Sequence, residues 1–153
     1  MNDFKPFEDK LAGLIAALSP AARRRMTADI AKKLRQRQQQ RIKLQKAPDG
    51  SPFAPRKRPP VRAKQGRIKH EMFAKLRTNR YMKASGNDSA AMVEFTGKVQ
   101  RIARVHQLGL KDKPSPKSAA VEYPRRQVLG FSEDDRVSVE SIFFDEIWHH
   151  IKG

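Results

Sequence analysis

Apolar residues recur at helical spacing in two runs within the first 34 residues. The first run is Phe4, Phe7, Leu11, Leu14, Ile15 and Leu18, and the second is Ala22, Met26, Ile30 and Leu34. Residues three or four apart lie on one face of a helix, so each run predicts an amphipathic helix. Ser19-Pro20 separates the two runs, because serine suits a helix N-cap and proline suits the first helical position. We therefore expect a helical hairpin over residues 4–45.

The residues that follow lose this apolar face and then lose regular structure. Residues 35–41 favour a helix but are polar all round, which is typical of a helix that projects into solvent or reaches a partner. Prolines and an Asp49-Gly50 turn signal come next, and residues 56–67 are then basic with almost no apolar content. Together these features predict an extended, proline-rich basic loop or arm over residues 46–67.

The second half of the chain mixes helix and strand patterns. Residues 68–76 favour a short helix, and strands are predicted at 80–84, 90–95 and 119–123, the first two forming a hairpin. Residues 97–109 predict a short helix laid against the sheet. Its expected apolar face consists of Val99, Ile102, Val105 and Leu108, and the basic residues on its other side are Lys98, Arg101 and Arg104.

The last helix begins after Ser132 and has more apolar bulk than one face needs. Its apolar residues include Ile142, Phe143, Phe144, Ile147, Trp148 and Ile151. Large exposed apolar surfaces mark interaction sites. The candidate subunit interface therefore consists of Phe143, Phe144, Ile147 and Trp148.

These patterns predict the α+β class, with an N-terminal helical hairpin, a small mostly antiparallel sheet carrying a short helix, and a C-terminal amphipathic helix. We expect a single domain over residues 1–153, made of the hairpin (4–45), the loop (46–67) and an α+β core with the last helix (68–153). The absence of cysteine excludes a disulfide framework. No apolar run approaches the roughly 18–20 residues of a membrane span, and the first residues do not resemble a signal peptide, so no membrane contact is expected.

The net charge of +17 is concentrated in one third of the chain. Between Lys32 and Arg80 there are 17 lysines and arginines against two acidic residues, whereas residues 1–31 and 81–153 carry a net charge of +1 each. A basic block of this kind binds a polyanion or an acidic protein surface, or it stays solvated.

No residue pattern in the sequence predicts catalysis or a metal site. The four histidines are His70, His106, His149 and His150. The adjacent pair points in two directions on a helix and cannot chelate a metal as an i, i+4 pair does, and His106 fits a packing or hydrogen-bonding role. There is no nucleophile elbow and no glycine-rich phosphate loop. We expect no enzymatic activity, and no catalytic, cofactor-binding or metal-binding residues.

Non-specific nucleic-acid binding through residues 32–80 is the alternative function. The basic block could neutralise phosphates, with an affinity that depends on salt. Proteins that bind single strands interleave aromatic residues for stacking, whereas only Phe53 and Phe73 lie in this block. Sequence-specific recognition is therefore not expected, while non-specific contact with a phosphate backbone stays open.

Four stretches carry a resemblance to a known family. They are residues 48–57 (PDGSPFAPRK), 72–77 (MFAKLR), 99–109 (VQRIARVHQLG) and 123–131 (YPRRQVLGF). In order and spacing the chain resembles the phage virion morphogenesis family, and the likeness runs from Phe4 to about Trp148. The Asp-Gly-Ser-Pro and His-Gln-x-Gly elements are its most specific parts.

The resemblance implies a structural virion protein that completes the tail of a phage with a contractile tail. Such proteins act late in assembly, inside the host bacterium, at the head-proximal end of the tail or in the neck. Related proteins form rings, usually hexameric. The implied partners are further copies of the chain, the tail tube or tail terminator, and head-completion or connector proteins, with transient contact with genomic DNA. The resemblance carries over no active site.

A ring subunit often carries an arm that becomes ordered on its neighbour. The candidate partner-binding arm lies in the basic loop and consists of Arg56, Lys57, Arg58, Arg62, Lys64 and Arg67. A protein partner is favoured over DNA, because tight phosphate binding along a channel wall would impede the passage of DNA.

Overall fold

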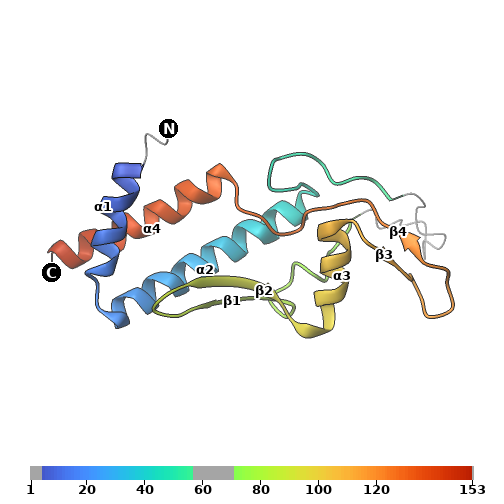
Figure 1. Cartoon of the computed structure of the whole chain (residues 1–153), viewed down its shortest axis with the longest axis horizontal. Coiled ribbons are helices and arrows are strands. Elements are labelled where there is room, and N and C mark those ends of the chain that lie inside the picture. Colours follow the sequence, from blue (N-terminus) through green and yellow to red (C-terminus); the bar gives the residue numbers. More distant parts are fainter. Residues whose placement is uncertain (1–4, 57–70, 153) are drawn as a thin grey trace. The chain divides into compact units, whose positions relative to one another are not determined.

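The computed structural model describes residues 5–56 and 71–152, except for the side chains of Phe7 and Lys152. The elements in chain order are α1 (Lys5–Ala16), α2 (Pro20–Lys43), β1 (Met82–Gly86), β2 (Ala91–Phe95), α3 (Gly97–Leu108), β3 (Lys111–Asp112), β4 (Val121–Glu122) and α4 (Glu133–Lys152) (Figure 1). The strands form two two-stranded sheets, β1 with β2 and β3 with β4. The predicted α+β class is confirmed.

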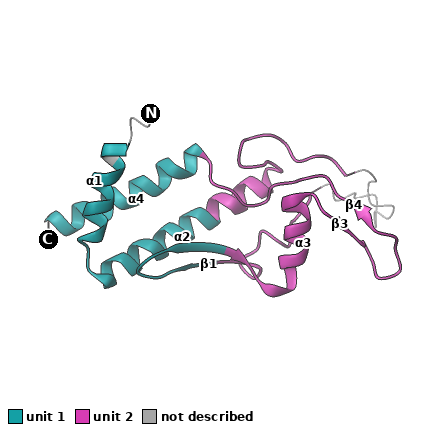
Figure 2. Cartoon of the chain, viewed as in Figure 1, with its two compact units in different colours: residues 1–35, 84–93, 133–153 teal, residues 36–83, 94–132 magenta. Residues whose placement is uncertain are grey.

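Two compact units divide the chain, and each is assembled from separate segments (Figure 2). Unit 1 contains residues 1–35, 84–93 and 133–153, and unit 2 contains residues 36–83 and 94–132. They are defined by packing between segments far apart in the chain, and no local pattern marks such boundaries.

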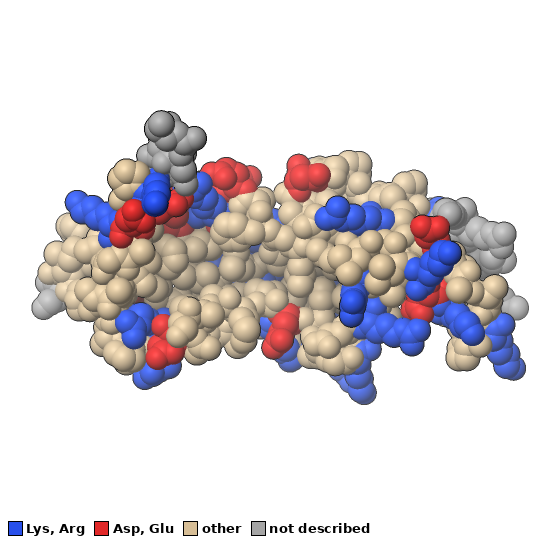
Figure 3. Space-filling view, viewed as in Figure 1, with Lys and Arg blue, Asp and Glu red and all other residues tan. Residues whose placement is uncertain are grey.

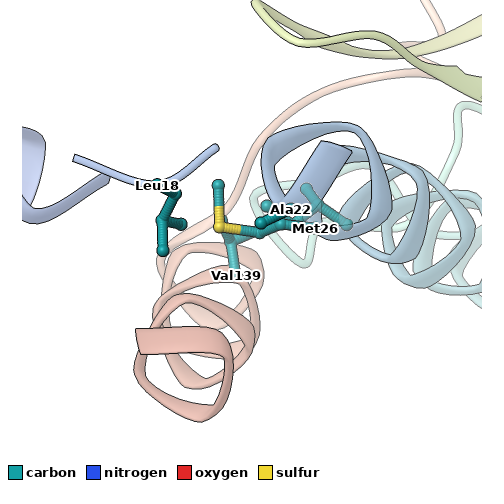
Figure 4. Packing of buried hydrophobic residues seen from close by; sticks show 5 residues of the cluster. Leu18, Ala22, Met26 and Val139 are labelled. Carbon is teal, nitrogen blue, oxygen red and sulfur yellow. The ribbon is translucent and has the colours of Figure 1, made fainter. Parts of the chain in front are cut away.

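The core of unit 1 joins the first two helices to the last one. Leu18, Ala22, Met26 and Ile30 are buried together with Val139 of α4, and Figure 4 shows the side chains of Leu18, Ala22 and Met26 close to Val139. The partly buried residues packed against this cluster are Ile15, Leu34, Ala91, Ile142 and Phe143. The apolar face predicted for the second helix is thus confirmed as a core face.

The predicted start of α2 is also confirmed. The Ser19 hydroxyl accepts a hydrogen bond of 3.1 Å from the backbone amide of Ala22, as a serine N-cap does. Pro20 is the first residue of the helix, where its missing N–H leaves no helical hydrogen bond unmade.

The hairpin of β1 and β2 is confirmed, and its glycine has a packing role in unit 1. A Cβ atom on Gly86 would lie 2.5 Å from the backbone nitrogen of Ala28 and 2.6 Å from the carbonyl carbon of Thr27. The Thr27 hydroxyl donates a 2.5 Å hydrogen bond to the carbonyl of Asn87. Glycine is therefore needed at this position because the strand runs against the α2 backbone, which only a residue without Cβ permits.

Two predicted elements differ from the structure, and one strand was not predicted. Residues 71–81 form turns, and the rest of the short helix predicted over 68–76 lies outside the described residues. Phe73 has φ = 66°, in the left-handed region that a right-handed helix excludes. The third strand is reduced to the two residues of β4. It pairs antiparallel with β3, which the sequence did not predict, in the register Lys111 with Glu122.

Helix α3 begins and ends close to its predicted limits, but its apolar face is only partly buried. Gly109 follows it at φ = 67° and donates its backbone amide to the Val105 carbonyl. Ala103 and Val105 are buried, whereas Ile102 and Leu108 of the expected face are exposed. No helix within the described residues is both long enough and apolar enough to cross a membrane.

Candidate protein-interaction surfaces

Side-chain amides and arginines connect the four stretches of the family resemblance, all of which lie in unit 2. Gln107 of α3 holds the segment that precedes α4. Its Oε1 accepts hydrogen bonds from the backbone amides of Val128 at 2.9 Å and Leu129 at 3.0 Å, and its Nε2 donates to the Leu129 carbonyl at 2.8 Å. One side chain thereby satisfies three backbone groups that have no strand partner to satisfy them.

Arg126 connects the same segment to the proline-rich stretch. Its Nε donates to the Ala54 carbonyl at 2.7 Å and its Nη2 to the Pro55 carbonyl at 3.1 Å. Its backbone amide donates to the carbonyl of His106 at 2.7 Å. Burial, followed by the charge of Arg56, lowers the pKa of the Arg126 guanidinium. The guanidinium fork therefore acts as a structural tie between residues 54–55 and residue 126.

His106 is packed between aromatic rings. Its ring centroid lies 4.8 Å from that of Phe73 and 5.0 Å from that of Tyr123. The His106 Nδ1 lies 3.4 Å from Nη1 of Arg126, and because arginine can only donate, Nδ1 accepts and the proton of the neutral ring lies on Nε2. Burial, and then the charges of Arg126 and Arg56, lower the pKa of His106 to about 4. The neutral ring fits the predicted packing and hydrogen-bonding role.

Residues 35–41 were expected to project into solvent or to reach a partner, and the structure shows that part of this polar end of α2 is packed within the chain. Gln38 is buried; its Nε2 donates to the Gly130 carbonyl at 2.8 Å and its Oε1 accepts from the Gly130 amide at 3.3 Å. Arg41 adds a 2.9 Å hydrogen bond to the same carbonyl. Hydropathy counts glutamine as a surface residue, but a buried amide that pairs with backbone is fully satisfied.

Gln45 makes a similar contact just after α2. It has φ = 59°, and its side chain accepts from the Met72 amide at 2.8 Å and donates to the Met72 carbonyl at 2.9 Å. Sequence reasoning missed the roles of all these polar residues. Gln107 and Arg126 could have been found, because they lie within the stretches of the resemblance. Gln38 and Gln45 gave no signal.

The charge of the chain is divided unequally between the two units. The segments of unit 1 contain 10 lysines and arginines against 11 acidic residues, whereas those of unit 2 contain 23 against five. On the face drawn in Figure 3, basic side chains gather over the region of α3, β3 and β4. The strongly basic surface therefore belongs to unit 2, and it extends well beyond the proline-rich loop.

The candidate partner-binding arm falls mostly outside the described residues. Arg56 is described, and its side chain is exposed in unit 2. Lys57, Arg58, Arg62, Lys64 and Arg67 lie outside the described residues. The basic side chains of α3, namely Lys98, Arg101 and Arg104, are exposed as predicted.

The candidate subunit interface on α4 is divided between the core and the surface. Ile147 is buried and Phe143 packs against the core of unit 1, so neither offers a large exposed surface. Phe144 and Trp148 are exposed, together with Val137 and Ile151, which the sequence analysis had not selected. These four side chains are 46% to 67% exposed, and we call them the α4 stripe.

The described residues contain no group of three or more His, Cys, Asp or Glu side chains placed to hold a metal ion. The adjacent histidines of α4, His149 and His150, are both exposed. The structure therefore offers two surfaces, the apolar α4 stripe on an acidic helix in unit 1 and a basic face in unit 2. The basic face consists of the exposed basic side chains of α3 and of the β3–β4 region, namely Lys98, Arg101, Arg104, Lys111, Lys113 and Lys117.

Comparison with known proteins agrees with the resemblance seen in the sequence. The model of the phage virion morphogenesis family matches residues 2–147. Tail completion protein S of Escherichia phage P2 is 49% identical over 143 residues, which make up 93% of this chain and 95% of that protein. No solved structure matches the chain. Because the family match spans nearly all of the sequence, including the four stretches joined in unit 2, the chain belongs to the phage virion morphogenesis family.

Proposed function

We propose that this chain is a structural virion protein that completes a phage tail. The observation that supports this most directly is the 49% identity with Tail completion protein S, which extends over 93% of the chain. The family match over residues 2–147 covers segments of both units, so the likeness is not confined to one part of the fold. Tail completion is then a binding function, carried out by surfaces rather than by a reaction.

A non-enzymatic role agrees with how the polar residues of unit 2 are used. The side-chain amides of three glutamines, Gln38, Gln45 and Gln107, form hydrogen bonds with backbone groups. The guanidinium group of Arg126 does the same. His106 has a pKa lowered to about 4, which makes it a weak base near neutral pH, and its half-buried ring is enclosed by Phe73 and Tyr123. These side chains stabilise a surface and are not arranged around a substrate.

The finer proposal places the protein at the head-proximal end of the tail, where tails are joined to heads. We propose that it acts there as a ring, with six subunits as the expected number, in contact with the tail tube or terminator and with head-completion or connector proteins. It would assemble in the cytoplasm of the host bacterium and remain in the virion neck. The division of charge between the units supports this, because a joining protein needs two chemically different surfaces.

The basic face of unit 2 fits an acidic protein surface better than DNA. Aromatic side chains there are occupied within the fold, since Phe53, Phe73 and Tyr123 contribute to ring contacts around His106. A single-strand site needs such rings exposed for stacking. Non-specific duplex binding through phosphates remains the alternative, and salt dependence separates it from the proposal.

The experiment is the assembly of phage particles without this protein. We expect filled heads and tails that fail to join, with joining restored by the wild-type chain supplied in trans and the protein located by electron microscopy at the head-proximal tail end. Normal particles formed without the protein, or tails that never polymerise at all, would contradict a role in tail completion and head–tail joining.

A second experiment separates the protein partner from DNA. The variant in which Arg56, Lys57, Arg58, Arg62, Lys64 and Arg67 are replaced by serine should fail to restore joining. Its affinity for duplex DNA, measured in low and high salt, should equal that of the wild type. A steep salt-dependent DNA affinity in the wild type that disappears in the variant would instead favour the nucleic-acid function.

A further inference from the structure

The α4 stripe lies on a strongly acidic helix. Val137, Phe144, Trp148 and Ile151 are separated by seven, four and three residues, so they follow one face of α4 over about four turns. The helix contains six acidic residues against Arg136 and Lys152. The acidic residues Glu133, Asp134 and Asp145 are exposed. The stripe is therefore an apolar surface with a negative border.

The exposed face of α3 has the opposite charge and a smaller apolar surface. Arg101, Arg104 and Leu108 are three and four residues apart, so they share one helix face, and all three are exposed. Arg125 lies beside the end of this helix, since a Cβ on Gly109 would be 3.0 Å from its backbone nitrogen. Exposed Leu110 follows α3, and exposed Val121 lies in β4. We call Arg101, Arg104 and Leu108 the α3 face.

We propose that the α4 stripe of one copy binds the α3 face of a second copy of this chain. Apolar side chains would be buried in the middle of the contact, with carboxylates of α4 against guanidinium groups of α3 at its border. An arginine can also lie flat on Trp148 or Phe144, because guanidinium groups stack on aromatic faces. This inference rests on the proposed ring, for which it names the contact between neighbouring subunits.

Pairing of two α4 stripes with each other is the competing arrangement, and charge disfavours it. It would bring the exposed acidic residues Glu133, Asp134 and Asp145 of two copies together, and like charges across an interface oppose association. The α4–α3 contact removes that repulsion. It is also heterologous, so each bound copy still offers one unused surface of each kind, and such contacts grow into closed rings when the rotation between neighbours allows it.

The single tryptophan of the chain makes the contact measurable. Trp148 is exposed on the stripe, so its fluorescence emission should move to shorter wavelength when a second copy covers it. Two variants isolate one contact. The first variant, called the stripe donor because only its α4 stripe can bind, carries Arg104→Glu and Leu108→Ser and keeps Trp148. The second variant, called the face donor because only its α3 face can bind, carries Phe144→Ser and Trp148→Ser and contains no tryptophan. Arg101 is left unchanged because it pairs with Asp112 at 2.5 Å.

The test titrates the face donor into the stripe donor at low salt, up to about 100 µM, because contacts of modest area reach only micromolar affinity. We expect a saturable shift in Trp148 emission, a 1:1 complex by light scattering, and roughly tenfold or greater weakening at high salt. Each variant alone should remain monomeric. Circular dichroism of each variant checks that the substitutions leave the fold intact.

Two controls give the experiment its specificity. A face donor that also carries Arg104→Glu and Leu108→Ser should produce no shift. A face donor with Lys43→Glu and Leu44→Ser, which also reverses one basic charge and replaces an equally exposed leucine (54% against 53% for Leu108), should bind normally. The proposal is overturned if no emission shift occurs, if the stripe donor self-associates alone, or if the two controls behave alike. Failure here with normal tail completion in phage would reject the contact and leave the proposed function standing.

Discussion

Gln107 and Leu129 are paired through the side chain of one and the backbone of the other. The Gln107 amide donates to the Leu129 carbonyl at 2.8 Å and accepts from the Leu129 amide at 3.0 Å, as a neighbouring strand would. Leu129 lies in the extended segment just before α4, so this contact connects two stretches of the sequence that carry the family resemblance. A buried backbone without a strand partner needs a side chain to satisfy it.

Substitution of Gln107 by leucine should therefore destabilise the protein. Leucine has a similar size but leaves three backbone groups without partners, and we expect a loss of about 2–3 kcal/mol in the free energy of unfolding. Urea denaturation measures it. The control is Gln36→Leu, at an exposed position of α2, which should change stability by less than about 0.5 kcal/mol. Equal effects of the two substitutions would show that the Gln107 hydrogen bonds contribute little.

His106 should make stability depend on pH in the mildly acidic range. Its pKa is about 4 in the folded protein against 6.5 ordinarily, so the unfolded chain binds a proton first as the pH falls. Stability should thus be constant above about pH 7 and decline from pH 6.5 to pH 4. Because the ring is partly solvated, we expect a loss of about 1–2 kcal/mol rather than the full value of the shift.

NMR titration of the His106 ring and chemical denaturation at several pH values test this. The matched variant is His106→Phe, which keeps a ring between Phe73 and Tyr123 but cannot be protonated. Its stability should decline less between pH 6.5 and pH 4 than that of the wild type. A His106 signal that titrates near pH 6.5 would contradict the half-buried, neutral ring.

Two glycines should respond in opposite directions to the same substitution. Gly86→Ala would place a Cβ 2.5 Å from the Ala28 backbone nitrogen, so either the hairpin or α2 must move, and we expect a loss of about 3 kcal/mol. Gly13→Ala lies inside α1 with no atom within 4 Å of the new Cβ, and helix propensity should raise stability by about 0.5–1 kcal/mol. Thermal unfolding of both variants gives the comparison. A neutral Gly86→Ala would show that the strand does not run so close to α2.

Adjacent arginines should differ sharply in how they tolerate lysine. Arg126 is buried and uses two nitrogens on the Ala54 and Pro55 carbonyls, which a single ammonium cannot reproduce. Arg126→Lys should therefore cost about 1–3 kcal/mol. Arg125 is exposed, and Arg125→Lys should be neutral within about 0.5 kcal/mol. Hydrogen exchange of the amides near residues 53–56 should increase only in the Arg126 variant. Indistinguishable exchange in the two variants would mean that Arg126 does not hold this stretch.

Much of the local structure could be predicted from the sequence alone. The spacing of Ala22, Met26, Ile30 and Leu34 specifies a helix face, and Ser19-Pro20 specifies where that helix starts, because caps and periodicity act within a few residues. The charge excess and the apolar bulk of the last helix also came from composition. The four stretches of the resemblance indicated the family without any coordinates.

The tertiary structure decided which surfaces are available and why the polar residues matter. Phe143 and Ile147 are packed inward while Phe144 and Trp148 lie outward, a distinction that depends on how α4 docks in unit 1. Gln38 was expected at the surface because hydropathy describes only the side chain. In the structure it forms hydrogen bonds with the backbone of Gly130, which lies 92 positions later in the sequence. Short-range propensity fixes helices and turns. Long-range packing and backbone satisfaction assign each side chain to the core or to a surface, and only the folded chain brings those partners together.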